Sequence, residues 1–158
     1  MNFPDTPPGP LCLVSACLCG VPCRYDGNSS PVEVLVDLHK RGVALAVCPE
    51  VDGGLPVPRP PCERVGERVL SRNGEDFTGQ FEAGAGYALA LAERHGISLA
   101  ILKERSPSCG SSIIYDGSFS GTRIQGQGVT AALLQENGIR VINEHTAQEA
   151  LSCGERLL

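Results

Sequence analysis

Short apolar runs alternate with amphipathic segments along most of the chain, and this alternation predicts the fold. The apolar runs predict four buried strands, at residues 11–16, 43–47, 99–102 and 139–142. Between and after them, apolar residues recur at helical spacing and predict helices at residues 31–41, 78–96, 131–137 and 146–153. Strands that alternate with helices predict a single α/β domain with a mostly parallel, Rossmann-like sheet and helices on both faces.

Segments rich in proline and glycine interrupt this pattern and predict irregular structure. Residues 1–10 carry four prolines and predict a flexible N-terminal arm, which leaves residues 11–158 as the folded domain. Residues 48–61 hold five prolines and two glycines, so they predict a rigid loop beside a strand end. Residues 62–73 predict a small hairpin or an irregular excursion, and residues 113–115 predict a short edge strand.

Composition and charge narrow the class of protein. A chain of 158 residues with 42% hydrophobic and 20% charged residues is typical of one soluble globular domain. The net charge of -5 argues against a nucleic-acid polymer as partner, although a single nucleotide needs only a local Arg or Lys. No run approaches the roughly 18 apolar residues of a membrane span, and the N-terminus lacks a signal-peptide pattern. We therefore expect a cytoplasmic location.

The eight cysteines are the most informative feature of the composition. In a chain without a secretory signal, metal binding or catalysis explains them better than a disulfide framework does. Soft thiolate ligands favour iron–sulfur clusters, zinc or copper(I). No Cys-x-x-Cys pair is present, which argues against a zinc ribbon and against a thioredoxin-type dithiol. Any ligands therefore come from distant segments of the chain.

Three of the cysteines, Cys17, Cys48 and Cys109, lie at or shortly after the end of a predicted strand. The carboxyl ends of neighbouring parallel strands lie about 4.8 Å apart at one edge of a sheet. We therefore expect the three thiols to lie close together, where they would suit a cluster or a metal ion. The alternative is that each cysteine is a small hydrophobic residue at a buried strand end.

The other cysteines have weaker positional signals. Cys19 and Cys23 lie in the first loop, where each is a candidate fourth ligand, a candidate resolving thiol or a residue without a role. Cys12, Cys62 and Cys153 are predicted bystanders, because the first falls inside a strand and the others fall in weakly specified regions.

Charged residues gather near the same strand ends. Glu50 and Glu104 are close enough to face a shared crevice, where either could move a proton or orient water. The alternative is that both are solvated loop residues. Candidate contacts for an anion, on the same grounds, are Arg24, Arg59, Lys103 and Arg105. The three histidines are scattered, and they form no Ser-His-Asp pattern.

Several longer motifs follow one another in a distinctive order. They are Ser15-Ala-Cys-Leu18, Cys23-Arg-Tyr-Asp-Gly27, Cys48-Pro-Glu50, Gly53-Gly-Leu-Pro-x-Pro-Arg-Pro-Pro61, Leu102-Lys-Glu-Arg-Ser-Pro-Ser-Cys-Gly110, Tyr115-Asp-Gly-x-Phe-x-Gly121 and Gly128-Val-Thr-Ala-x-Leu133. This set resembles the thiouracil desulfidase family, and the match extends from about Leu11 to Ile142. One position departs from the family pattern, because Cys19 stands where Leu is usual.

The resemblance implies a [4Fe–4S] enzyme that removes sulfur from 4-thiouracil or 4-thiouridine nucleotides and releases sulfide without net redox change. Its partner would be this small thiolated pyrimidine or its nucleotide, with no nucleic-acid polymer and no membrane. Matching the motifs places the three cluster ligands at Cys17, Cys48 and Cys109, the same thiols found at the strand ends. Cluster irons are normally held by four thiolates, so one iron would not be bound by protein and would be open to the substrate sulfur.

Roles for other residues are implied by their positions in these motifs. Glu50 or Glu104 would serve as the base near C4 of the pyrimidine. Ser106 and Ser108 would hydrogen-bond the pyrimidine edge or the attacking water. If the substrate is a nucleotide, the residues that would hold its phosphate are Arg24, Lys103 and Arg105.

Two other classes of protein are compatible with the sequence. In a non-enzymatic iron–sulfur or thiol redox sensor, Cys19 or Cys23 would complete a four-thiolate site and close the iron to substrate. In a zinc hydrolase, the thiolates would hold zinc instead of a cluster. Metal analysis, together with a test for a free coordination position, separates the three classes.

Overall fold

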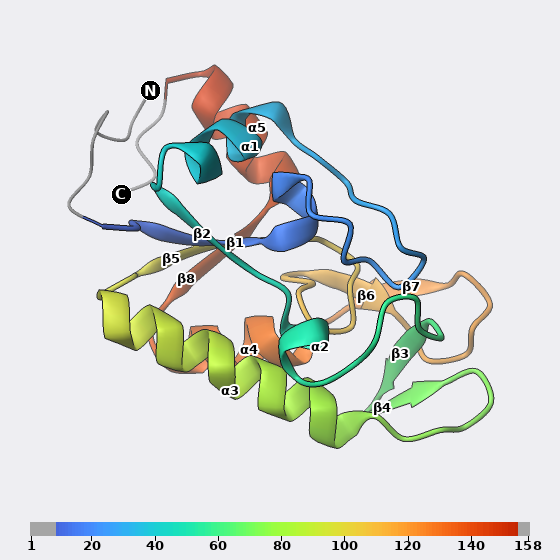
Figure 1. Cartoon of the computed structure of the whole chain (residues 1–158). Helices are drawn as coiled ribbons and strands as arrows, with labels where there is room; N and C mark the ends of the chain where they lie inside the picture. The colour runs from blue at the N-terminus through green and yellow to red at the C-terminus, as the bar shows by residue number, and fades with distance from the viewer. Residues whose placement is uncertain (1–8, 155–158) are drawn as a thin grey trace.

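A four-stranded parallel sheet forms the centre of the molecule (Figure 1). The computed structural model describes residues 9–154, so most of the predicted N-terminal arm lies outside the described residues. The strands are β1 (Cys12–Ser15), β2 (Ala44–Val47), β5 (Leu99–Leu102) and β8 (Arg140–Asn143), in the order β2-β1-β5-β8. All neighbouring pairs are parallel, and the four strands correspond to the four predicted apolar runs.

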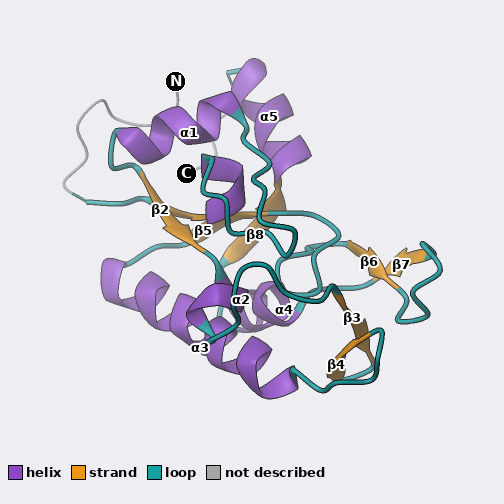
Figure 2. Ribbon diagram, turned by 45° about the vertical axis from the view of Figure 1, so that its right-hand side comes forward, coloured by secondary structure: helices purple, strands orange, loops and turns teal. Residues whose placement is uncertain are grey.

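Helices cover both faces of this sheet, which confirms the predicted fold class. In Figures 1 and 2, α1 (Glu33–Lys40) and α5 (Glu144–Ser152) lie on one side, and α3 (Thr78–His95) and α4 (Val129–Glu136) lie on the other. Side chains alternate along a strand. Val14 therefore packs in one buried apolar cluster with residues of α1 and α5, and Leu13 packs in a second cluster with residues of α3 and α4.

Three helices begin two residues away from their predicted starts, and one of them is α4, which begins at Val129 instead of residue 131. For the other two, the partners of nearby polar groups explain the shift. The helix predicted from residue 31 begins at Glu33, since Ser30 donates its N–H to the Cys17 carbonyl (2.9 Å) and its hydroxyl accepts from Arg24. The helix predicted from residue 146 begins at Glu144, where the Asn143 side chain accepts the N–H of Thr146 at 2.9 Å. Strand β8 therefore passes directly into a capped helix.

Two antiparallel hairpins lie beyond the carboxyl end of β1 (Figure 1). The first, β3 (Cys62–Val65) with β4 (Arg68–Ser71), gives the predicted excursion at residues 62–73 a definite structure. The second pairs β6 (Ile113–Tyr115) with β7 (Arg123–Gln125), so the predicted edge strand at 113–115 belongs to a separate hairpin. The strands β3 and β6 contact each other, which makes the two hairpins one outer wall.

Two short helices turn the chain at strand ends where the sequence predicted loops. The 3₁₀ helix η1 (Ala16–Cys19) follows β1, and α2 (Pro49–Asp52) follows β2. The backbone of α2 packs directly on α3, because a Cβ atom added to Gly84 would lie 1.7 Å from the Pro49 carbonyl oxygen. Only glycine permits such a close approach between backbones. Gly84 thus sets the position of the turn that carries Cys48.

Candidate active site

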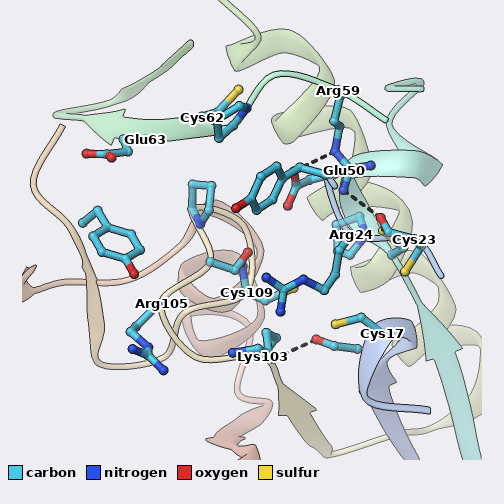
Figure 3. A pocket seen from close by; sticks show the side chains of 18 of the residues that line it. Cys17, Cys23, Arg24, Glu50, Arg59, Cys62, Glu63, Lys103, Arg105 and Cys109 are labelled. Carbon is cyan, nitrogen blue, oxygen red and sulfur yellow. Dashed lines mark hydrogen bonds and ion pairs between the residues drawn. The ribbon is translucent and has the colours of Figure 1, made fainter. Parts of the chain in front are cut away.

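A cavity of about 460 Å³ opens at the carboxyl ends of three parallel strands (Figure 3). Its inner lining includes Ser15 at the end of β1, Val47 at the end of β2 and Lys103 just after β5. This is the sheet edge at which the sequence predicted a site. Five of the eight cysteines line the cavity, and they are Cys17, Cys23, Cys48, Cys62 and Cys109.

The three strand-end thiols meet in this cavity as free cysteines. Cys17 lies in η1, Cys48 directly precedes α2, and Cys109 lies in the loop after β5. Burial, together with the charge of Cys48, raises the pKa of Cys17 to about 11. Burial also raises the pKa of Cys109 to about 12, with a contribution from the charges of Cys17 and Cys48. Each thiol is thus within electrostatic reach of the others, and without a bound metal the thiols of Cys17 and Cys109 stay protonated.

This donor set fits a cluster better than a single ion. Among residues 9–154, no group of three or more His, Cys, Asp or Glu side chains is arranged to hold one metal ion. Three free thiols that line one cavity are soft ligands of the kind that hold an iron–sulfur core. Metal binding would also displace the protons that burial retains on the thiols.

A fourth thiol, that of Cys23, lies beside Cys48. A hydrogen bond between the two side chains is the main reason that the pKa of Cys48 falls to about 7, and it raises the pKa of Cys23. The Cys48 sulfur also lies 3.8 Å from the Cys23 carbonyl oxygen. Cys19, the other candidate in this loop, packs with Cys12 in the apolar cluster under α1 and does not line the cavity. The structure therefore favours Cys23 over Cys19 as a thiol with a part in the site.

Arg59 is a buried clamp and not an open anion contact. Its side chain is only 3% exposed, its Nε lies 3.1 Å from Glu50 Oε1, and its Nη2 donates to the Cys23 carbonyl at 2.9 Å. These bonds connect the loop after β1 to the turn after β2 (Figure 3). Burial raises the pKa of Glu50, and the Arg59 charge offsets part of that rise. A carboxyl group with a raised pKa, two residues from Cys48, is suited to proton transfer.

Glu104 has a different environment, which disfavours the predicted role as a base. Its carboxylate accepts the N–H groups of Ser111 (2.9 Å), Ser112 (3.2 Å) and Ile113 (3.3 Å), and the Asn143 amide donates to it at 2.7 Å. Burial alone would raise the pKa of Glu104, but the hydrogen bonds from Ser112, Ile113 and Asn143 outweigh it and lower the pKa to about 2. Glu104 is therefore a fixed anion that shapes the 104–113 loop.

The two serines of the central motif have backbone and buried partners. The Ser106 hydroxyl accepts the N–H groups of Ser108 (3.1 Å) and Cys109 (3.0 Å), and Ser106 lines the cavity. The Ser108 hydroxyl is buried, bonds the Thr130 hydroxyl at 2.9 Å and does not reach the cavity lining. Helix α4 holds this loop too, because Thr130 donates its N–H to the Ser108 carbonyl at 2.9 Å. Ser106 stays a candidate for substrate contact, and Ser108 has a structural position.

Three polar residues of the site escaped the sequence analysis. The Ser15 hydroxyl accepts the Lys103 N–H at 2.9 Å and hydrogen-bonds the Cys109 side chain. Glu144 accepts the Glu104 N–H at 2.8 Å and forms an ion pair of 3.0 Å with Lys103. The third residue is Asn143, which bonds the Glu104 carboxylate. Their signal was related to the one that located the cysteines, because Ser15 and Asn143 end strands of the central sheet and Glu144 directly follows one.

The predicted anion contacts divide into paired and unpaired cations. Lys103 is paired with Glu144, and Arg24 bonds the Ser30 hydroxyl and lies 3.6 Å from Asp26. In the part of the chain that the structure describes, the Arg105 guanidinium has no hydrogen-bond or ion-pair partner. Arg72, which the sequence did not single out, also lines the cavity. Cys62, a predicted bystander, lies on the same outer wall.

These features define a class of site. A parallel α/β sheet that delivers three free thiols, a buried carboxyl group and several cations to one cavity has the donor set of an iron–sulfur active site. The chain belongs to the 2-thiouracil desulfurase family, whose family model matches residues 12–146. The resemblance read from the sequence motifs is thereby confirmed.

Two relatives extend this result. The solved structure of the [4Fe-4S]-dependent thiouracil desulfidase TudS is 50% identical to this chain and superposes on it with a TM-score of 0.86, and the match covers 92% of this chain and 98% of TudS. "Uncharacterized protein YbbK" of Bacillus subtilis (strain 168) is 42% identical over 151 residues, which are 89% of this chain and 100% of that protein. In the described residues, no helix is long and apolar enough to cross a membrane.

Proposed function

We propose that this protein is a [4Fe–4S]-dependent desulfidase that removes sulfur from 4-thiouracil or 4-thiouridine nucleotides by hydrolysis. The observation that carries the proposal is the meeting of three free thiols from three strand ends in one cavity, in a chain 50% identical to a thiouracil desulfidase. The overall change replaces the C4 sulfur with the oxygen of water and releases sulfide, so no external electron donor or acceptor is needed.

Cys17, Cys48 and Cys109 would hold the cluster in this proposal. When bound through three protein ligands, the cluster supplies an iron open to the thiocarbonyl sulfur, which acts as a soft Lewis acid toward the C–S bond. Lys103 and Arg24 lie near Cys17, and Arg59 lies near Cys48, so each offsets negative charge on the thiolates. These cations therefore favour the deprotonated state that ligation requires.

Glu50 is the residue that we expect to move protons. Its carboxyl group lines the cavity, and Arg59 fixes it through Oε1. Its other oxygen has no partner in residues 9–154, so it is available to take a proton from the water that attacks C4. The Ser106 side chain lines the same cavity and would orient the pyrimidine or the water.

A redox sensor is the second candidate, and one observation favours it. Cys23 lines the cavity with its side chain hydrogen-bonded to Cys48, where it could supply a fourth thiolate. Full thiolate ligation would close the iron to substrate. Loss of Cys23 separates the two functions, because an enzyme would keep its turnover and a sensor would lose a ligand.

The test is anaerobic iron and sulfide analysis combined with turnover of 4-thiouracil and 4-thiouridine 5′-monophosphate. We expect about four irons per chain and release of sulfide from substrate. Replacing Cys17, Cys48 or Cys109 by Ala should abolish both, whereas Cys153→Ala, at an exposed cysteine outside the cavity, should change neither. Glu50→Gln should keep the iron and lose turnover. Iron without turnover would favour the sensor, and absence of iron after reconstitution would refute both.

A further inference from the structure

The outer wall of the cavity has no part in the reaction described so far. The two hairpins contribute Glu63, Tyr115 and Phe119 to its lining. Arg72 directly follows β4, and Arg105 comes from the loop after β5, where it forms a β-bridge with Ile114 of β6. In Figure 3, Glu63 and Arg105 lie across the cavity from Cys17 and Cys23. A substrate whose sulfur points toward the thiols would therefore direct its opposite end toward this wall.

Glu63 ties the two hairpins together at this wall. A single carboxylate oxygen, Oε1, accepts the N–H groups of Gly117 (3.0 Å) and Phe119 (3.1 Å). Gly117 has a φ of +93°, and a Cβ atom added there would lie 2.7 Å from Cγ2 of Val65 in β3. The turn that joins β6 to β7 is thus pressed against β3 and held there by two charge-assisted hydrogen bonds.

This docking maintains an unusual backbone conformation at Phe119. Its φ of 57° lies in the left-handed region, which bulky residues rarely adopt. Strain of this kind persists only where the surrounding contacts impose it, and it concentrates at ligand sites. Its ring lines the cavity and lies 5.6 Å from Cζ of Arg72, as ring centroid to guanidinium carbon. A cation over an aromatic face at this distance is a favourable arrangement.

The two cations of the outer wall differ from the cations of the inner site. In the described part of the chain, the guanidinium groups of Arg72 and Arg105 make no hydrogen bond and no ion pair. By contrast, the inner cations Arg59 and Lys103 are paired with Glu50 and Glu144. In a chain of net charge -5, two unpaired guanidinium groups on one cavity wall fit an anionic group of the ligand.

We propose that Arg72, Phe119 and Arg105 form a specificity wall for a phosphate group carried by the substrate, and that Glu63 is the residue that positions this wall. The inference rests on the proposed desulfidase function, because it assumes that the C4 sulfur faces the thiols. Phe119 would contact the sugar, and the two guanidinium groups would bind the phosphate. Glu63 would act indirectly, since it holds Phe119 and thereby the ring on which Arg72 lies.

Steady-state kinetics of the cluster-loaded enzyme with two substrates test this proposal. Arg72→Gln should raise the KM for 4-thiouridine 5′-monophosphate about tenfold or more, the loss expected for a charge-assisted hydrogen bond. The kinetics with 4-thiouracil, which has no phosphate, should not change. Arg68→Gln is the matched control, because Arg68 begins β4, the strand that Arg72 directly follows, pairs with Asp76 at 3.0 Å and does not line the cavity.

Glu63 is tested by a pair of substitutions. Glu63→Ala removes the acceptor for both N–H groups, so the KM for the nucleotide should rise while kcat for 4-thiouracil is kept. Glu63→Gln keeps an acceptor oxygen and should restore most of the nucleotide affinity, which a purely electrostatic role would not allow. The exposed Glu67, in the turn between β3 and β4, provides the control Glu67→Gln.

Calorimetric binding of uridine 5′-monophosphate, with inorganic phosphate and uracil as comparison probes, provides a readout that does not depend on turnover. We expect the nucleotide to bind and the dissociation constant to rise about tenfold in Arg72→Gln but not in Arg68→Gln. Equal effects of Arg72→Gln on nucleotide and free base would overturn the proposal, as would no effect on either. If wild type turns over neither substrate, the proposed function fails, and the calorimetric comparison still decides whether the wall binds phosphate.

Discussion

Replacing Glu104 by Gln should destabilise the protein by removing a buried anion from its network of donors. The amide oxygen of Gln can still accept from the backbone, but its NH₂ group would face the Asn143 amide, which now donates to Glu104 at 2.7 Å. Asn143 cannot simply turn its amide around, because its oxygen caps α5 by accepting the Thr146 N–H. The substitution therefore places two donors against each other in a buried site.

The expected magnitude follows from the pKa of Glu104. Burial opposes the charge, yet the hydrogen bonds from Ser112, Ile113 and Asn143 lower this pKa from 4.5 to about 2. At about 1.4 kcal/mol for each tenfold change in proton affinity, the ionised side chain contributes about 3 kcal/mol to folding. A depressed pKa means that this contribution is complete above about pH 4.5 and is lost as the pH falls toward 2.

The assay is urea unfolding of the wild type and Glu104→Gln under identical anaerobic conditions, from pH 7 down to pH 3. We expect the variant to be less stable by about 3 kcal/mol at pH 7, and we expect the difference to shrink below pH 4.5. Other carboxylates titrate in both proteins, so they cancel from the difference. Glu82→Gln, at an exposed position of α3, is the control. A difference below about 1 kcal/mol, or one that does not vary with pH, would refute the reasoning.

Two further predictions concern the turn after β2 and the first loop. Gly84→Ala should lower stability by about 1–3 kcal/mol, seen as a lower melting temperature, and should reduce iron content, because its Cβ would lie 1.7 Å from the Pro49 oxygen. The control Gly86→Ala, where a Cβ meets nothing within 4 Å, should be neutral or stabilising, and equal effects would contradict this packing. Cys19→Ala should keep the iron content of the wild type, because Cys19, unlike Cys17, does not line the cavity; loss of iron would make it a ligand.

The sequence predicts those parts of this protein that depend on local pattern. Each strand of the central sheet is a run of four residues, and β1 and β5 are buried throughout, so apolar composition alone located them. The topology of parallel strands then brought Cys17, Cys48 and Cys109 to one edge without any knowledge of the loops. These thiols lie far apart in the chain, but each needed only its own strand to be recognised.

Contacts between loops were beyond the reach of the same method. Glu104 is bonded to Asn143, 39 residues away in the chain, and Lys103 forms an ion pair of 3.0 Å with the next residue, Glu144. No local pattern predicts which polar residue of one loop meets which residue of another. The left-handed Phe119 is a further example, because its conformation depends on Glu63, which lies 56 residues earlier.

Four glutamates at this end of the sheet show why geometry must decide their roles. Glu104 is saturated by donors, and Glu144 uses one oxygen for a backbone N–H and the other for Lys103. Glu63 has an oxygen left over, but it lies across the cavity from the thiols. Only Glu50 combines a raised pKa, a free oxygen and a place two residues from Cys48, a proposed cluster ligand. A proton carrier must be able to exist in both charge states, so Glu50 alone of the four is suited to that role.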